Sequence, residues 1–181
     1  MKNHDAGRIP LSRKQREQKQ GEFPYYGASG IIDHVDDYIF DGDYVLLSED
    51  GENLRTRKTP VSFLASGKFW VNNHAHILTG AHGVCLQHLL QFLHHVDIAP
   101  YLTGAVQPKL NQSNMNRIPF ILPPPSVCEA FSLLVHPSTM SHRANVEESR
   151  KLATLRDYLL PKLLSGEVRV ADAAKITGRA G

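Results

Sequence analysis

The segment IPFILPPP (118–125) leads into a leucine-rich stretch that closes with LRDYLLPKLLSGEVRV (155–170). Four leucines in this stretch follow one another at steps of three or four residues: Leu152, Leu155, Leu159 and Leu163. Such steps place the four side chains on one face of a helix. The run of prolines marks a hinge, because proline cannot continue a preceding helix. We therefore expect a compact N-terminal domain joined to a helical arm whose leucine face meets a partner helix.

Apolar residues recur at helical spacing from Ser126 onward, first at 127–135 and then, after a polar break, along the leucine face. The second helix is expected to run from about residue 141 to residue 165, which gives roughly 37 Å at 1.5 Å per residue. Ser138 or Ser141 fits its N-terminal cap, and Gly166 fits a left-handed C-terminal cap. Pro161 predicts a bend one turn earlier. On spacing alone, an amphipathic helix packed against its own domain is an equal alternative.

Short runs of branched and aromatic residues predict the strands of the N-terminal domain. They are residues 30–34, 44–47, 61–64, 68–71 and 74–78. Residues 84–95 have leucines at helical spacing and predict a helix. The connections are too short for regular βαβ units. The fold class expected is therefore α/β in the sense of mixed α+β, with a compact β-rich domain followed by a long C-terminal helix of the coiled-coil type.

Composition sets the outer bounds. A chain of 181 residues with 41% apolar residues can form one core and an appendage. No apolar run reaches the length of a membrane span, and the polar N-terminus does not resemble a signal peptide, so we expect a soluble, cytoplasmic protein. Cys85 and Cys128 are too few for a disulfide framework or a zinc site.

The net charge of +2 hides an uneven distribution. Residues 1–19 carry six basic and two acidic side chains, and a second basic cluster lies at 55–58. Residues 31–52 carry eight acidic side chains and no lysine or arginine. The distribution fits one basic and one acidic surface. The alternative is a poorly ordered basic N-terminus and a solvated loop.

Motifs for catalysis are mostly missing from the sequence. It has no phosphate-binding loop, no Gly-x-Ser-x-Gly elbow and no Asn-Pro-Pro-aromatic element of an adenine methyltransferase. His74 and His76 alternate along a predicted strand and could begin a metal site, but no third ligand follows at a recognisable spacing. An acidic run could serve a metal-dependent nuclease: Asp41, Asp43, Glu49, Asp50 and Glu52. We predict no metal and no cofactor, and keep a nuclease or other hydrolase as the alternative function.

Four blocks of the chain, in order, resemble type I restriction-modification DNA specificity subunits. They are GEFPYYGASGIIDHVDDYIFDGDYVLLSEDG (21–51), KFWVNNHAHIL (68–78), YLTGAVQPKLNQSNMNRIPFILPP (101–124) and the closing LRDYLLPKLLSGEVRV. The resemblance implies a DNA target recognition domain at 1–124, a helical arm at 125–166 for dimerisation and methyltransferase binding, and a C-terminal tail at 167–181. It also implies a non-catalytic subunit that reads one half of a split target and directs adenine methylation and restriction by partner subunits.

The resemblance also suggests which residues meet DNA. The candidates for phosphate contact are Arg13, Lys14, Arg16, Lys19, Arg55, Arg57, Lys58 and Lys109. The loop-borne candidates for base reading are Tyr25, Tyr26, Asn72, Asn73 and His74. Alternatively, the tyrosines pack in the core and Asn73 caps a turn. Residues 107–109 match a block common to family members that read different sequences, which favours backbone contact or scaffolding over specificity.

The implied partners are double-stranded DNA, an adenine methyltransferase subunit, a restriction and translocation subunit, and a second arm from another copy or another specificity half. The family's usual two recognition domains are reduced here to one domain and one arm, and the usual opening strand is not apparent. We expect either a natural half subunit or a truncated piece. A degenerate fragment that only dimerises is a further alternative.

Overall fold

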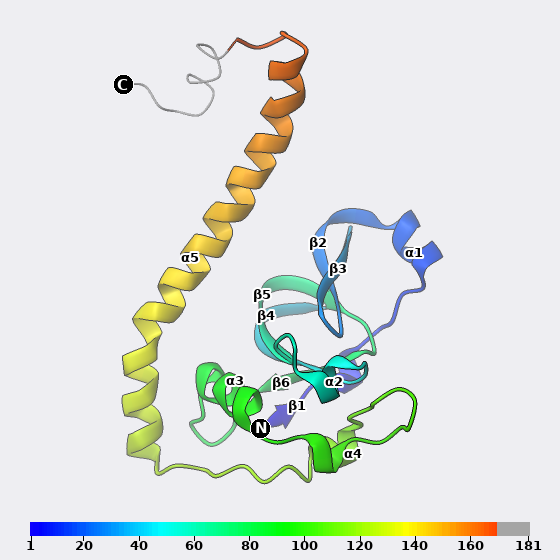
Figure 1. Ribbon diagram of the computed structural model, residues 1–181. Helices are drawn as coiled ribbons and strands as arrows, with labels where there is room; N and C mark the ends of the chain where they lie inside the picture. The colour runs from blue at the N-terminus through cyan, green and yellow to red at the C-terminus, as the bar shows by residue number, and fades with distance from the viewer. Residues whose placement is uncertain (170–181) are drawn as a thin grey trace. The chain divides into compact units, whose positions relative to one another are not determined.

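The computed structural model describes residues 1–169, except for the side chain of Arg150, so residues 170–181 of the predicted tail lie outside the described residues. It separates into two compact units, Met1–Ser132 and a second that begins at Leu133. Each unit is described by itself below. The mixed α+β class expected from the sequence is confirmed (Figure 1).

The first unit is built on a single curled sheet of six strands in the order β1-β6-β4-β5-β2-β3. All neighbouring strands are antiparallel except β2 and β5, which run parallel. The strands are β1 (Lys2–Asn3), β2 (Gln20–Gly27), β3 (Gly30–Val35), β4 (Phe40–Ser48), β5 (Ser62–Val71) and β6 (Ala75–Thr79). The short helices around the sheet are η1 (Asp5–Gly7), α1 (Arg13–Gln18), α2 (Asn53–Thr56), α3 (Leu86–His95), η2 (Ala99–Tyr101) and α4 (Gln112–Met115).

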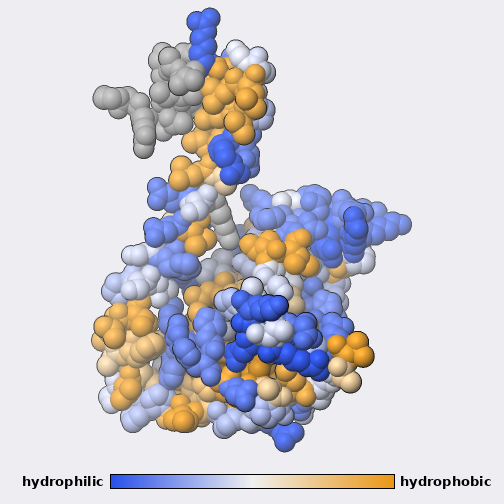
Figure 2. Space-filling model, viewed as in Figure 1, coloured by the Kyte–Doolittle hydropathy of each residue, from blue (hydrophilic) through white to orange (hydrophobic). Residues whose placement is uncertain are grey.

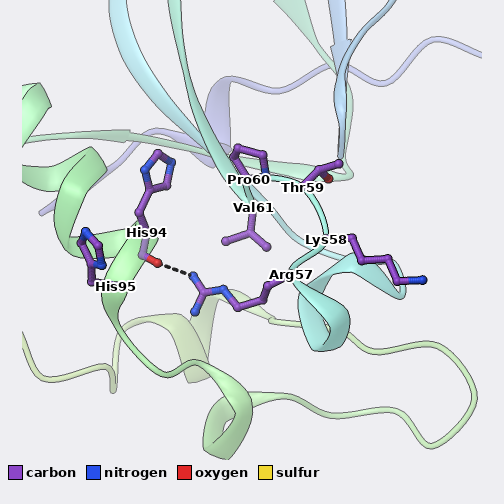
Figure 3. A pocket seen from close by; sticks show the side chains of 7 residues that line it. All are labelled: Arg57, Lys58, Thr59, Pro60, Val61, His94 and His95. Carbon is purple, nitrogen blue, oxygen red and sulfur yellow. Dashed lines mark hydrogen bonds between the residues drawn. The ribbon is translucent and has the colours of Figure 1, made fainter.

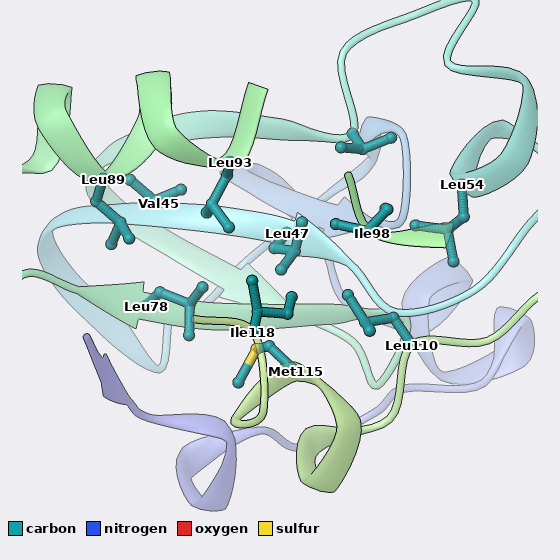
Figure 4. Packing of buried hydrophobic residues seen from close by; sticks show 11 residues of the cluster. Val45, Leu47, Leu54, Leu78, Leu89, Leu93, Ile98, Leu110, Met115 and Ile118 are labelled. Carbon is teal, nitrogen blue, oxygen red and sulfur yellow. The ribbon is translucent and has the colours of Figure 1, made fainter. Parts of the chain in front are cut away.

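Strand β4 lies at the centre, and its two faces contribute to different hydrophobic clusters. Val45 and Leu47 pack with Leu89 and Leu93 of α3, in the cluster drawn in Figure 4. Leu46 belongs to an aromatic cluster on the other face. Alternate side chains of a strand point to opposite faces, so the unbroken apolar run VLL supplies both clusters. With both faces covered, the carboxyl-terminal half of β4 is buried.

Two strand predictions need correction. The runs 61–64 and 68–71 belong to one strand, β5, because the residues between them pair with β4. Gly67 adopts φ +76 and lies opposite Gly42, so a segment that resembles a turn stays in the ladder. Strand β2 was not predicted, since Gly21 and Pro24 are usually strand breakers. The predicted helix at 84–95 is confirmed as α3.

The arm is one helix, α5 (Pro125–Leu164), of 40 residues and roughly 60 Å. The expected break before residue 141 is wrong: the helix continues through Pro137, and through Pro161. Ser138 and Ser141 therefore lie inside the helix, and neither caps its N-terminus. Each proline lacks an amide donor, yet the helix extends on both sides of it. Gly166 has the predicted left-handed conformation, with φ +75. No helix among the described residues is long and apolar enough to cross a membrane.

Candidate nucleic-acid interface

Four turns meet at the carboxyl end of β4, and we call them together the loop rim. They are the β2–β3 turn at 27–30, the turn at 49–53, the turn at 72–74 and the loop at 103–109. The Ser48 hydroxyl donates to the carbonyl of Ala28, and the Glu49 amide donates to the carbonyl of His74 at 2.9 Å. The Gly51 amide donates to the Pro108 carbonyl at 3.1 Å. These hydrogen bonds join turns that are far apart in sequence.

Of the base-reading candidates, Asn73 and His74 are exposed on the loop rim. His74 Nδ1 lies 2.6 Å from a carboxylate oxygen of Asp50. Asn72 is buried, and its side-chain oxygen accepts the His74 amide at 2.8 Å, which shapes the turn. The structure thus separates one amide side chain that builds the turn from two side chains that face solvent.

Arg55 and Lys109 bring positive charge to the same rim. Arg55 Nη2 donates to the Gly104 carbonyl at 2.8 Å, and Nη1 lies 3.7 Å from Glu52. Lys109 Nζ lies 3.2 Å from Glu49. Both side chains are about half exposed. The Arg55–Glu52 pair is exposed, and such pairs contribute only about 0–1 kcal/mol, so Arg55 could exchange this carboxylate for a phosphate at little cost. Glu49, the partner of Lys109, is largely buried and also pairs with Arg8, so that pair is not of the exposed kind.

A second basic patch is helix α1, beside β3. The helix starts with a capping box formed by Ser12 and Gln15, so the alternative of a poorly ordered segment is wrong for these residues. Its four predicted phosphate contacts divide into two kinds. Arg16 is largely buried: its Nε lies 2.9 Å from Asp33, and its guanidinium lies over the Tyr25 ring. More exposed are Arg13, Lys14 and Lys19.

The predicted loop position of Tyr25 and Tyr26 is wrong, because both lie in β2. Tyr25 is fully buried, and its hydroxyl accepts the Leu11 amide at 2.9 Å. Tyr26 is 5% exposed and packs against Phe63 and Phe69. The core alternative considered from the sequence describes where both rings lie.

Arg57 and Lys58 border a surface hollow of about 460 Å³ (Figure 3). Arg57 adopts φ 46, and its guanidinium donates to the carbonyls of Val96 and Leu93 at 2.6 and 2.8 Å. It therefore caps the C-terminus of α3, where carbonyl groups lack helical partners. Lys58 points away from His94 and His95 in Figure 3, so the cations around the hollow do not converge on one point.

A buried ionic cluster lies beneath the loop rim, made of Asp5, Arg8, Glu49, His76 and Lys109. His76 is fully buried, with Nδ1 2.6 Å from Asp5 and Nε2 2.7 Å from the Leu110 carbonyl. Both ring nitrogens face acceptors, so the arrangement requires a proton on each. Arg8 Nη1 lies 2.7 Å from Glu49 and Nη2 lies 3.3 Å from Asp5.

The carboxylates of this cluster are held in their charged form. Burial raises the pKa of Asp5, but hydrogen bonds from His76, Asn3 and the Ile77 amide outweigh it, and the pKa lies below the ordinary value of 3.8. For Glu49, burial likewise raises the pKa, while the hydrogen bond from Arg8 and the charge of His76 bring it below 4.5.

The same cluster contains the one group of three potential metal ligands among the described residues: Asp5, Glu49 and His76. Arg8 and Lys109 already neutralise its carboxylates. His74 and His76, which the sequence suggested as a pair, contact different carboxylates, Asp50 and Asp5. Of the acidic run, Asp41 and Asp43 lie exposed on β4 in register with Lys68 and Ser66. Nothing in this arrangement supports the nuclease alternative.

The sequence analysis missed Val106, which lies at the tip of the loop at 103–109 and is 94% exposed. Gln107 beside it is also exposed and belongs to the block 107–109, for which the sequence favoured backbone contact or scaffolding. The local sequence signal for an exposed tip is the pair of turn formers, Gly104 and Pro108, on either side.

Comparison with known proteins agrees with the resemblance. Residues 3–127 match the family described as type I restriction modification DNA specificity domain. A putative type I restriction enzyme specificity subunit of Haemophilus influenzae is 36% identical over 107 residues, or 59% of this chain and 27% of that protein. The type I restriction enzyme MjaIX specificity subunit of Methanocaldococcus jannaschii is 26% identical over 138 residues, 74% of this chain and 31% of that protein. The matched part is thus about a third or less of either relative.

Proposed function

Since this chain belongs to the family of type I restriction modification DNA specificity domains, we propose that it is a non-catalytic subunit that recognises DNA sequence. It reads one half of a split target. A methyltransferase subunit supplies adenine methylation, and a restriction and translocation subunit supplies cleavage. The two relatives are named as specificity subunits of restriction enzymes, which supports this division of roles.

The observation that carries the proposal is the convergence of four turns into the loop rim at the end of a rigid central strand. Sequence readers need polar side chains on loops whose scaffold does not move. Asn73 and His74 are the proposed base readers, because they are exposed and lie in a turn fixed by Asn72 and Glu49. Amide and imidazole groups can pair with base edges in the major groove.

The proposed phosphate contacts are the cations that reach the surface: Arg13 and Lys14 on α1, Lys19 just after it, Arg55 and Lys109 on the loop rim, and Lys58. We assign scaffold roles to Tyr25, Tyr26, Arg16 and Arg57, whose side chains are held by the domain itself. Contacts to phosphates fix the register of a protein on DNA without reading its sequence.

The arm binds the methyltransferase subunit and a second arm. The restriction subunit joins through the complex that forms in this way. Its exposed hydrophobic residues include Leu152 at 58%, Tyr158 at 55% and Leu164 at 80%. Hydrophobic side chains gather toward the C-terminal end of α5 in the view of Figure 2. Exposed apolar surface of this extent is typical of an interface.

The experiment that tests the function is a genome-wide map of methylated adenines in cells that express this chain with the methyltransferase subunit of its system. We expect a methylated motif that is absent from cells without the chain. His74→Ala should relax or abolish one position of the motif, whereas His95→Ala, an exposed histidine outside the rim, should leave it unchanged. If wild-type cells show no chain-dependent motif, the proposal is wrong.

A further inference from the structure

The loop at 103–109 is fixed more firmly than a surface loop requires. The amides of Thr103 and Lys109 each donate to the carbonyl of the other at 2.8 Å, which closes the base of the loop. Pro108 is buried, and its carbonyl accepts the Gly51 amide. At Gly104, φ is +84 and an added Cβ would lie 2.1 Å from the Gln107 carbonyl oxygen, so no other residue fits without a shift.

Arg55 holds the loop from one side. Its Nη2 donates to the carbonyls of Gly104 and Ala105, at 2.8 and 3.3 Å. The peptide bonds of the loop are trans, and in a trans peptide the N–H points opposite to the C=O. The amides of Ala105 and Val106 therefore point away from Arg55. Two successive donors face outward, with a guanidinium charge behind them.

The tip of the loop does not pack on the rest of the described chain. Val106 is 94% exposed, and the loop extends from the domain just before α4 in Figure 1. Among residues 1–169, the amides of Ala105, Val106 and Gln107 and the side chain of Gln107 have no hydrogen-bond partner. These donors and the exposed Val106 side chain are therefore available to a ligand.

We propose that this loop grips a phosphate of the DNA backbone independently of sequence. The two outward amides and the Gln107 amide group donate to the phosphate oxygens, and Val106 covers the neighbouring deoxyribose. Backbone amides bind phosphate without reading bases. Lys109 at the base of the loop is half exposed and adds a positive charge. Arg55 also positions the loop, because its Nη2 holds the carbonyls of Gly104 and Ala105.

The inference rests on the proposed function and names a contact within it. The test compares Val106→Asp with Val106→Asn, which have the same shape and differ by one negative charge at the tip. Since the side chain is almost fully exposed, both variants should unfold at the wild-type temperature. The probes are two 30-base-pair duplexes. One contains the motif identified by the methylation map, and the other contains the same bases in scrambled order. The affinity of the full chain for each duplex is measured at low and at high salt.

We expect Val106→Asp to weaken binding to both duplexes by about tenfold at low salt, and by much less at high salt, because the effect is electrostatic. Val106→Asn should bind within about twofold of wild type, because it adds no charge. Equal affinity of the two variants would overturn the loop contact and leave the proposed function intact. A loss confined to the motif duplex would also overturn it, since that would indicate a base contact. A wild-type chain that binds neither duplex would overturn both proposals.

Discussion

At the scale of single residues, the buried ionic cluster predicts how stability depends on pH. Asp5 has a pKa below its ordinary value of 3.8 in the folded state. The stabilising contribution of its carboxylate to the free energy of unfolding is therefore fully present above pH 3.8, and it is lost as the pH falls through the folded pKa. We expect Asp5→Asn to lower the free energy of unfolding at pH 7 by about 3 kcal/mol, because it leaves His76 buried without its carboxylate.

Urea unfolding at pH 7 and below pH 3.8 measures this effect. The difference in free energy of unfolding between wild type and Asp5→Asn should become smaller in acid, because the wild-type carboxylate is then neutral as well. Asp37→Asn serves as the control, since Asp37 is exposed and bonds only to the neighbouring Tyr38 amide. A gap that stays constant with pH would mean that the charge of Asp5 contributes nothing and that the variant acts through packing.

The sequence predicted which residues are cationic but not which of them are available to a ligand. Arg16 and Lys14 looked equivalent in the sequence, yet Arg16 is bound to Asp33 and Lys14 is exposed. Arg57 adjoins Lys58, but only Arg57 caps α3. These differences depend on contacts made across 17 to 39 residues, which local spacing does not encode.

At the scale of elements, the arm predicts an effect on assembly without an effect on the domain. Leu152 is 58% exposed in the isolated chain, whereas Leu159 is 7% exposed. We expect Leu152→Glu to abolish binding of the methyltransferase subunit at micromolar concentration, because the interface would bury an unpaired charge. The thermal unfolding of the recognition domain should not change. Co-purification and light scattering measure the assembly.

Asp157→Lys is the matched control, because Asp157 is exposed and lies on a different side of α5 from Leu152. It should assemble normally. If Leu152→Glu assembles as well as the control, then the leucine face is not the interface with the methyltransferase. Leu159→Glu would be a poorer test, since burial within its own chain makes a folding defect hard to separate from an assembly defect.

Periodicity predicted the arm and its C-terminal cap, but not the continuity of its helix. The leucine spacing gives the face of α5, and Gly166 has the backbone conformation expected after a helix. A break ahead of residue 141 is expected because Pro137 and the polar residues around it resemble a helix end, yet α5 runs through them from Pro125. In the domain, the loop rim could not be predicted, since its four turns are joined only by the order of the strands in the sheet.

At the scale of the whole molecule, pairing of two arms would fix the symmetry of the DNA target. Two copies joined through the same face of α5 form a two-fold dimer, because like surfaces meet only about such an axis. Each copy presents the same loop rim, so the two half-sites must have the same sequence on opposite strands. We expect a solution mass of twice 20.2 kDa at micromolar concentration and a split palindromic methylation motif. Leu152→Glu should reduce the solution mass to that of the monomer, and methylation of the motif should be lost in the same variant. An asymmetric motif, or a wild-type chain that stays monomeric, would instead require a second, different recognition domain as the partner of this arm.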